Sequence, residues 1–261
     1  MSIDQKKNPV TWCAIGDSFT YLDSHLDETD YRLHKGYLTR TLELLPPGVH
    51  LINLGINGSA TSDWLAPKLP AADFYTILLG TNDWFSRRTP LGSEADFQNG
   101  NSGSILGNLR LLIDCIRSVS PESPIFVMNP VERGEFVYLF DSLNHAHGSD
   151  RPENGLWLKD VARQIFTCVR GKNIVPIDLH TRCGFTPENA VHFKRVLRDG
   201  KTVDLTYEDY CHAPEFNPDT DPYPYPEEAI YMTYDGLHPS DEGAQIIAEI
   251  LSSEIRLGCS F

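Results

Sequence analysis

The sequence lacks the features that mark several broad classes of protein. No apolar run approaches the length that crosses a bilayer, and the first ten residues, MSIDQKKNPV, lack the apolar core of a signal peptide. Basic residues are few: 22 Lys and Arg stand against 36 Asp and Glu, a formal charge of −14, and no basic run occurs. Such a chain is poorly suited to binding phosphate backbones or anionic membranes. We therefore expect a cytoplasmic protein with no membrane span and no nucleic-acid partner, or a secreted one if a leader has been removed.

Cysteine and histidine patterns of metal or redox sites are also missing. The six cysteines are scattered and contain no CxxC pair, which argues against a zinc ribbon or a thiol redox site. We expect most of them to be buried thiols, and the sequence leaves a Cys183–Cys211 disulfide open. His145 and His147 are two residues apart but have no clear third ligand, so we expect no metal.

What the sequence does contain is enough apolar residues for a sizeable core. Of its 261 residues 41% are hydrophobic, so folding needs no disulfide or metal. Short apolar runs closed by turn residues predict five buried strands, at Val10–Ile15, His50–Leu54, Phe74–Leu79, Ile125–Met128 and Ile174–Ile177. Apolar side chains at helical spacing predict helices within Leu38–Leu45, Ile105–Ile116 and Leu158–Val169, and after Ser240, a good N-cap.

The alternation of strands and helices predicts the fold class. Strands that are buried on both faces indicate a parallel sheet in a three-layer α/β/α sandwich. Two stretches, 131–152 and 180–234, interrupt the alternation, and we expect both to be insertions into a single domain spanning residues 1–261. The second is too long for a plain connection, so we predict a short helix near Pro187–Leu197 followed by an extended flap. The sequence leaves open whether this flap is a lid or a dimer contact.

Chemistry in such a fold is expected beyond the carboxyl ends of the strands. Four blocks stand at that edge: Gly16-Asp17-Ser18-Phe19-Thr20, Gly55-Ile56-Asn57-Gly58-Ser59, Gly80-Thr81-Asn82-Asp83-Trp84 and Asp235-Gly236-Leu237-His238-Pro239. Together they supply a hydroxyl, glycine amides, a side-chain amide and an Asp–His pair. A serine nucleophile needs an adjacent base, the base needs a carboxylate that orients it, and the oxyanion needs hydrogen-bond donors. The inventory therefore matches acyl transfer.

These four blocks, in this order, resemble those of the SGNH or GDSL hydrolase superfamily of esterases and lipases. The resemblance runs from the first strand to the last helix, apart from the two stretches above. It implies a flavodoxin-like sheet and no cofactor. It also implies Ser18 as nucleophile, His238 as general base and then acid, and Asp235 as the group that orients it. The oxyanion hole would consist of the backbone amides of Ser18 and Gly58 and the side-chain amide of Asn82.

Other residues of the blocks have structural interpretations. We expect Asp17 to hold the turn before Ser18, Asp83 to act as a structural partner, and Gly55 to be a turn residue. Trp84 lies two residues after Asn82, and Tyr234 directly precedes Asp235. We name both as substrate contacts, and the sequence leaves ordinary core packing open for Trp84.

The substrate is argued from the absence of a broad apolar lid and from a flap richer in Tyr than in Leu or Ile. We expect a serine esterase that hydrolyses a small carboxylic ester, such as an O-acetyl group on a carbohydrate. The alternatives are a lysophospholipase or thioesterase acting on longer acyl chains, a non-catalytic family member that binds a glycan, and an interaction protein that uses the flap as its contact surface.

Overall fold

A five-stranded parallel sheet forms the centre of the computed structural model, which describes residues 9–213 and 215–259. The sheet has the order β2-β1-β3-β4-β7, and every neighbouring pair is parallel. Its strands are β1 (Val10–Gly16), β2 (Val49–Asn53), β3 (Phe74–Leu78), β4 (Ile125–Met128) and β7 (Ile174–Ile177). The predicted sheet is confirmed, because each strand lies where an apolar run predicted one.

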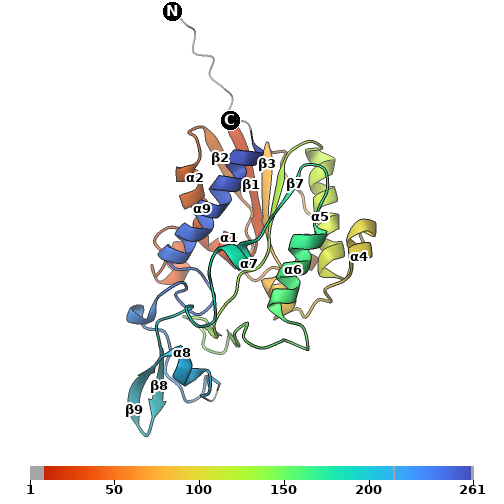
Figure 1. Cartoon of the computed structure of the whole chain (residues 1–261). Helices are drawn as coiled ribbons and strands as arrows, with labels where there is room; N and C mark the ends of the chain where they lie inside the picture. Colours follow the sequence, from red (N-terminus) through yellow and green to blue (C-terminus); the bar gives the residue numbers. More distant parts are fainter. Residues whose placement is uncertain (1–8, 214, 260–261) are drawn as a thin grey trace, which may run out of the picture.

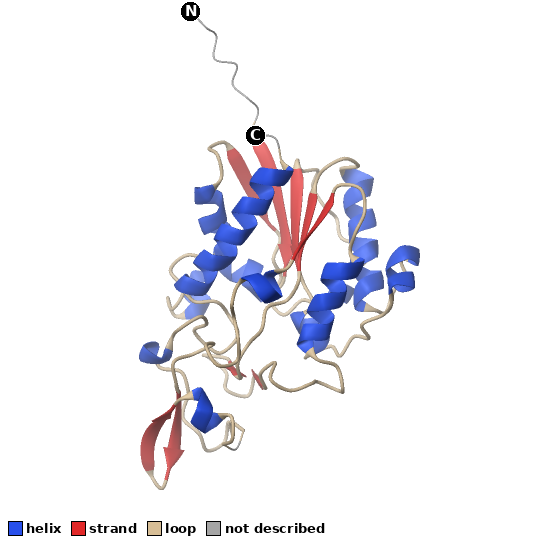
Figure 2. Ribbon diagram, viewed as in Figure 1, coloured by secondary structure: helices blue, strands red, loops and turns tan. Residues whose placement is uncertain are grey.

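Helices cover both faces of this sheet (Figures 1 and 2). Alternate strand residues point to opposite faces. Thus Phe74 and Phe126 join the core cluster under α2 (Tyr37–Leu44) and α9 (Asp241–Gly258). Tyr75 and Val127 join the cluster under α5 (Ile105–Val119) and α6 (Leu158–Cys168). The three-layer α/β/α architecture is therefore confirmed.

Shorter helices decorate the loops. They are α1 (Ser18–Tyr21), α3 (Thr81–Trp84), α4 (Glu94–Asn99), α7 (Leu179–Arg182) and α8 (Tyr207–Tyr210), with 3-10 turns at Leu22–Ser24, Leu26–Thr29, Thr61–Trp64 and Glu227–Ala229. The predicted cap of the last helix is confirmed, because Ser240 Oγ accepts a hydrogen bond from the Gly243 amide at 3.3 Å. The register also sets the site: Gly16 lies opposite Leu78, so α1 and α3 follow neighbouring strand ends.

The 131–152 and 180–234 segments lie beyond the carboxyl end of the sheet (Figure 1). The first contains a hairpin of β5 (Phe136–Val137) and β6 (His145–Ala146), and the second contains the hairpin of β8 (Lys194–Arg198) and β9 (Lys201–Leu205). The predicted helix near Pro187–Leu197 is wrong. Asp199 and Gly200 both have positive φ, at 50° and 74°, and this Asp-Gly turn joins two strands. That both segments are insertions into one domain stays a prediction.

The cysteines remain unpaired. All six lie within the described residues and are free thiols, so the Cys183–Cys211 disulfide that the sequence left open is not made. Among the described residues, no helix combines the length and the apolar character that a membrane span requires.

Candidate active site

Ser18 stands at a sharp turn where the central strand β1 passes into α1. The turn is tight because Gly16 has no side chain; a Cβ there would lie 2.0 Å from Thr20 Oγ1 and 3.0 Å from the Leu78 carbonyl oxygen. Asp17 Oδ1 accepts a hydrogen bond from the Phe19 amide at 3.2 Å and so caps the first turn of α1. Ser18 is thereby presented at the carboxyl edge of the sheet, with 6% of its surface exposed.

His238 connects Ser18 to Asp235 by two hydrogen bonds. Its Nε2 lies 2.9 Å from Ser18 Oγ, and its Nδ1 lies 2.7 Å from Asp235 Oδ2. Because an ionised carboxylate only accepts, the neutral imidazole carries its proton on Nδ1 and donates it to Asp235. Nε2 then accepts the hydroxyl proton of Ser18. The three side chains named from the sequence thus form one hydrogen-bonded chain.

The carboxylate of Asp235 is held from several sides. Asp235 is fully buried, and its Oδ1 accepts hydrogen bonds from the amides of Leu237 and His238, at 3.0 and 2.8 Å. The imidazole is also enclosed: the Tyr234 ring stacks on it with 5.8 Å between centroids, and the Phe136 ring meets it edge-on at 5.5 Å. Both His238 and Asp235 are therefore held in place by the protein itself.

A cavity of about 420 Å³ opens beside this chain of side chains. Gly58 and Asn82 line it together with Ser18 and His238. Asn82 Nδ2 donates to the Ser59 carbonyl oxygen at 3.0 Å, which holds the side-chain amide beside the loop that carries Gly58. The three predicted oxyanion donors therefore surround one cavity from the ends of β1, β2 and β3.

Buried polar residues tie these loops together, as expected for Asp83. Its carboxylate accepts hydrogen bonds from the Thr61 amide at 2.9 Å and the Thr61 hydroxyl at 2.6 Å, which joins the loop after β2 to α3. Gly55 has a structural role too, since a Cβ there would lie 2.3 Å from the Tyr21 amide nitrogen. Burial raises the pKa of Asp83, and it raises the pKa of Asp17 to about 7.

The two predicted substrate contacts do not lie on the cavity wall. Trp84 is 1% exposed, and its indole Nε1 donates to the Leu156 carbonyl oxygen at 2.6 Å. Tyr234 is 2% exposed and packs behind the imidazole. Both are supports of the site in this structure. Adjacency in the chain does not determine which way a side chain points, and their contact with a substrate stays a prediction.

The wall of the cavity contains residues that the sequence gave no signal for. Besides the predicted residues and Asn57, these are Leu22, Ser86, Arg87, Phe136, Tyr138, Asn144 and Leu237. Phe136, Tyr138 and Asn144 come from the 131–152 segment, whose place over the site depends on tertiary contacts. Neither of the two histidines considered as metal ligands lies there: His147 Nε2 contacts Glu153 at 2.8 Å, and His145 packs on Phe216. Within the described residues, no group of three or more potential metal ligands occurs.

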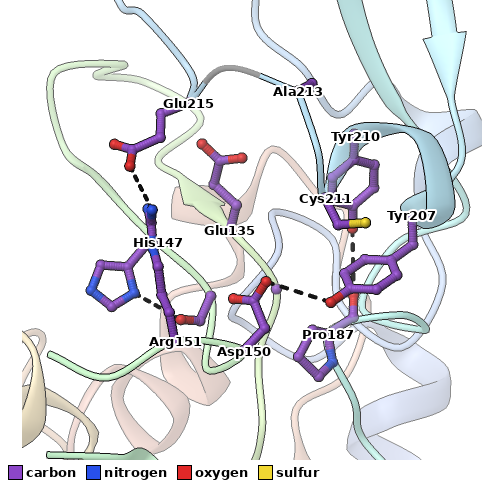
Figure 3. Close-up of a pocket in the computed structure, with 12 residues that line it drawn as sticks. Glu135, His147, Asp150, Arg151, Pro187, Tyr207, Tyr210, Cys211, Ala213 and Glu215 are labelled. Atoms are coloured by element: carbon purple, nitrogen blue, oxygen red, sulfur yellow. Dashed lines mark hydrogen bonds and ion pairs between the residues drawn. The ribbon is translucent and has the colours of Figure 1, made fainter. Parts of the chain in front are cut away.

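A second cavity, of about 280 Å³, lies between the 131–152 segment and α8 (Figure 3). Charged and hydroxyl groups in it pair with one another: Arg151 bonds to Glu215 at 2.5 Å, and Tyr207 Oη donates to Asp150 at 3.4 Å (Figure 3). These contacts join the two segments to each other. Ser18 and His238 are not among the residues that line this cavity.

Comparisons with known proteins agree with this geometry. A model of the GDSL-like lipase/acylhydrolase family matches residues 14–246. The solved structure of a possible lipase from Chitinophaga pinensis is 42% identical, with 96% of this chain and 100% of that chain covered and a TM-score of 0.91. Among curated proteins, no relative matches.

More distant structures share the fold. A protein from Lactobacillus plantarum is 17% identical, with 97% of this chain and 100% of that chain covered and a TM-score of 0.54. A lipase from a goat rumen metagenome is 18% identical, with 94% and 96% covered and a TM-score of 0.51. The family match covers all four sequence blocks. This chain belongs to the GDSL-like lipase/acylhydrolase family.

Proposed function

We propose that the protein is a serine esterase that hydrolyses small carboxylic esters through an acyl-enzyme. The observation that carries this proposal is the chain Ser18–His238–Asp235, with contacts of 2.9 and 2.7 Å at the edge of a cavity that also meets Gly58 and Asn82. Membership of a family of lipases and acylhydrolases points to ester hydrolysis in general. The roles of these residues and the identity of the ester are the parts that we propose.

In the acylation step, Ser18 Oγ attacks the carbonyl carbon of the ester while His238 Nε2 takes the hydroxyl proton. The imidazolium that forms is stabilised by Asp235, whose carboxylate faces Nδ1. The carbonyl oxygen becomes an oxyanion, and the donors aimed at it are the amides of Ser18 and Gly58 and the Asn82 side chain. As the tetrahedral intermediate collapses, His238 returns the proton to the oxygen of the departing alcohol.

Deacylation uses the same groups with water in place of the alcohol. His238 takes a proton from a water molecule, whose oxygen attacks the acyl carbon bonded to Ser18 Oγ. The second tetrahedral intermediate is stabilised by the same three donors. When it collapses, the proton on Nε2 goes to Ser18 Oγ and the carboxylic acid leaves. The enzyme returns to its starting state, and no cofactor takes part in either step.

A short acyl group is our first candidate, and an O-acetylated carbohydrate is the substrate class we favour. The side-chain amides of Asn57 and Asn82, which line the cavity, support a hydroxylated alcohol portion. A second candidate is hydrolysis of longer acyl chains, as in a lysophospholipase or thioesterase. It is favoured by Phe140 and Leu143, which are 60% and 72% exposed in the turn between Tyr138 and Asn144.

Hydrolysis of p-nitrophenyl esters from acetate to palmitate tests the proposal. We expect acetate to be fastest and Ser18→Ala to abolish hydrolysis. Ser86→Ala is the matched control, because Ser86 lines the same cavity but donates its hydroxyl to the Asn82 carbonyl oxygen at 3.0 Å. A maximum at eight carbons or more would favour the second candidate.

Labelling with a fluorophosphonate separates an enzyme from a glycan-binding protein. An activated nucleophile is phosphonylated, so we expect covalent modification at Ser18 and its loss in His238→Gln. An unlabelled wild-type protein that is equally inactive on every ester would contradict the esterase proposal.

A further inference from the structure

Arg87 is a cationic side chain on the wall of the Ser18 cavity. It lies three residues after the end of α3, and its amide donates to the Asn82 carbonyl oxygen at 2.9 Å. The residue proposed to bind the oxyanion and the residue that carries the guanidinium are therefore held in one short turn. This fixes Arg87 near the reacting centre without placing it among the groups that transfer protons.

The charge on Arg87 is only weakly engaged. Within the described residues, Arg87 makes one ion pair, from Nη2 to Asp63 Oδ2 at 3.3 Å. The side chains of Arg87 and Asp63 are 53% and 36% exposed. Exposed pairs of this kind contribute little, because water screens the charges. A guanidinium has five N–H donors, and the contact with Asp63 is the one side-chain hydrogen bond that Arg87 makes to the described residues, so donors remain for a ligand in the cavity that Arg87 lines.

The positive charge of Arg87 distinguishes it from the other residues that line the cavity. The other lining residues carry no permanent charge: they supply amides, hydroxyls and an imidazole, and apolar side chains such as Leu22, Phe136 and Leu237. The chain as a whole carries a formal charge of −14, so a cation in this position opposes the general field of the protein. A guanidinium recognises carboxylate and phosphate by paired, charge-assisted hydrogen bonds.

We infer that Arg87 binds an anionic group, a carboxylate or a phosphate, on the ester substrate. The inference rests on the proposed esterase function and specifies the substrate class of that same site. Asp63 pairs with the guanidinium when no substrate is bound, and the substrate anion displaces the Asp63 carboxylate. Arg87 thus selects anionic esters over neutral ones of the same shape.

The test uses aryl acetates that differ only in charge: phenyl acetate, 4-acetoxybenzoate and 4-acetoxyphenyl phosphate. A second pair, phenyl butyrate and phenyl hemisuccinate, places the anion on the acyl portion. The quantity compared is the ratio of kcat/KM for an anionic ester to kcat/KM for its neutral partner. We expect Arg87→Gln to lower this ratio about tenfold to a hundredfold for at least one anionic ester, mainly through KM. The ester affected identifies the anion and the portion of the substrate that carries it.

Two further variants make the test specific. Arg88→Gln is the matched control, because Arg88 pairs with Glu153 at 2.8 Å and is not among the residues that line the cavity. It should leave the ratio unchanged. Asp63→Asn removes the competing carboxylate and should raise the ratio. Added salt should lower the ratio in the wild type and have less effect in Arg87→Gln, since screening weakens the ionic contact.

The outcomes distinguish this inference from the proposed function. A ratio that Arg87→Gln leaves unchanged, or that Arg88→Gln lowers equally, overturns the inference while Ser18-dependent hydrolysis still supports an esterase. If no ester is hydrolysed, the anion site is tested by calorimetry instead, which measures the binding of 4-hydroxybenzoate, 4-hydroxyphenyl phosphate and succinate. Binding that is lost in Arg87→Gln supports the anion site, and absence of binding to the wild type overturns it.

Discussion

The amide of Gly134 donates a hydrogen bond to the carbonyl oxygen of Gly236, with 2.9 Å between nitrogen and oxygen. The amide of Val137 makes a second bond, to the Asp235 carbonyl oxygen at 3.2 Å. The 131–152 segment therefore runs along the loop that carries Asp235 and His238. The contact is so close that a Cβ on Gly236 would lie 1.8 Å from the Glu135 carbonyl oxygen.

Replacement of this glycine should damage both stability and activity. Gly236 has φ of 91°, so Gly236→Ala adds backbone strain to the collision with Glu135. Gly184→Ala is the matched control, because Gly184 has φ of 70° and nothing within 4 Å of its added Cβ. We expect the control to lose about 1–2 kcal/mol in urea unfolding, from strain alone. Gly236→Ala should lose more and should also hydrolyse esters much more slowly; equal effects of the two changes would refute this role of Gly236.

Glu135 joins the 131–152 and 180–234 segments through a buried ion pair. Its carboxylate meets the ammonium of Lys194, which is 3% exposed, and also accepts the Phe216 amide at 2.9 Å. Glu135→Gln leaves that ammonium buried without a counter-charge, and we expect a loss of about 3–5 kcal/mol in the free energy of unfolding.

The double variant Glu135→Gln/Lys194→Met is the decisive comparison. It removes the stranded charge, so it should recover much of the stability lost by Glu135→Gln alone, as measured by urea unfolding. Additive losses in the double variant would mean that the two side chains act independently.

Asn82→Ala should slow catalysis with little effect on substrate binding. Loss of one oxyanion donor lowers kcat by about a hundredfold to a thousandfold, because the donor acts mainly in the transition state. Asn82→Asp should be at least as harmful, since a carboxylate repels the oxyanion. Asn144→Ala, from the opposite wall of the cavity, serves as the control and should cost less than about tenfold. A rise in KM with kcat unchanged would assign Asn82 to ground-state binding instead.

Asp17 should make stability depend on pH. Burial raises its pKa from an ordinary value of 3.8 to about 7, so the folded protein keeps a proton that the unfolded chain releases near pH 4. The folded state therefore binds more protons across that window, and this contribution to the free energy of unfolding falls as pH rises from about 4 to about 7.

Asp17→Asn removes the titration but keeps an oxygen that can accept from the Phe19 amide. Urea unfolding of both proteins across this pH range should show the wild type losing stability relative to the variant. A difference that stays constant with pH would show that Asp17 is ionised throughout.

The sheet could be predicted because its strands are buried on both faces. Such strands are nearly continuous apolar runs, and turn residues such as Gly16 and Gly80 end them clearly. The predicted triad could be named because its residues follow recognisable blocks. The parallel sheet then explains why Ser18 and Asn82 lie at one cavity, because β1 is paired with β3 and both residues follow the carboxyl ends of these strands.

The walls of the cavity could not be predicted in the same way. Tyr138 and Arg87 have no local pattern that distinguishes them from surface residues, and their places depend on contacts between distant segments. The helix expected near Pro187–Leu197 was wrong for a different reason. The Asp199-Gly200 turn is a local hairpin signal that the length of the stretch does not reveal, and it joins β8 and β9.

Ser18 and His238 are separated by 220 positions in the chain. A ribosome therefore completes the serine and its turn long before it adds the histidine. A nascent chain that stops short of His238 lacks the base that we propose for Ser18, however much of the sheet has already formed. Only when the last helix, α9, has emerged and packed against α2 is the loop of Asp235 and His238 held in place. In the proposed mechanism, ester hydrolysis thus begins only after α9 has been made, and we expect fragments that end before His238 to be inactive.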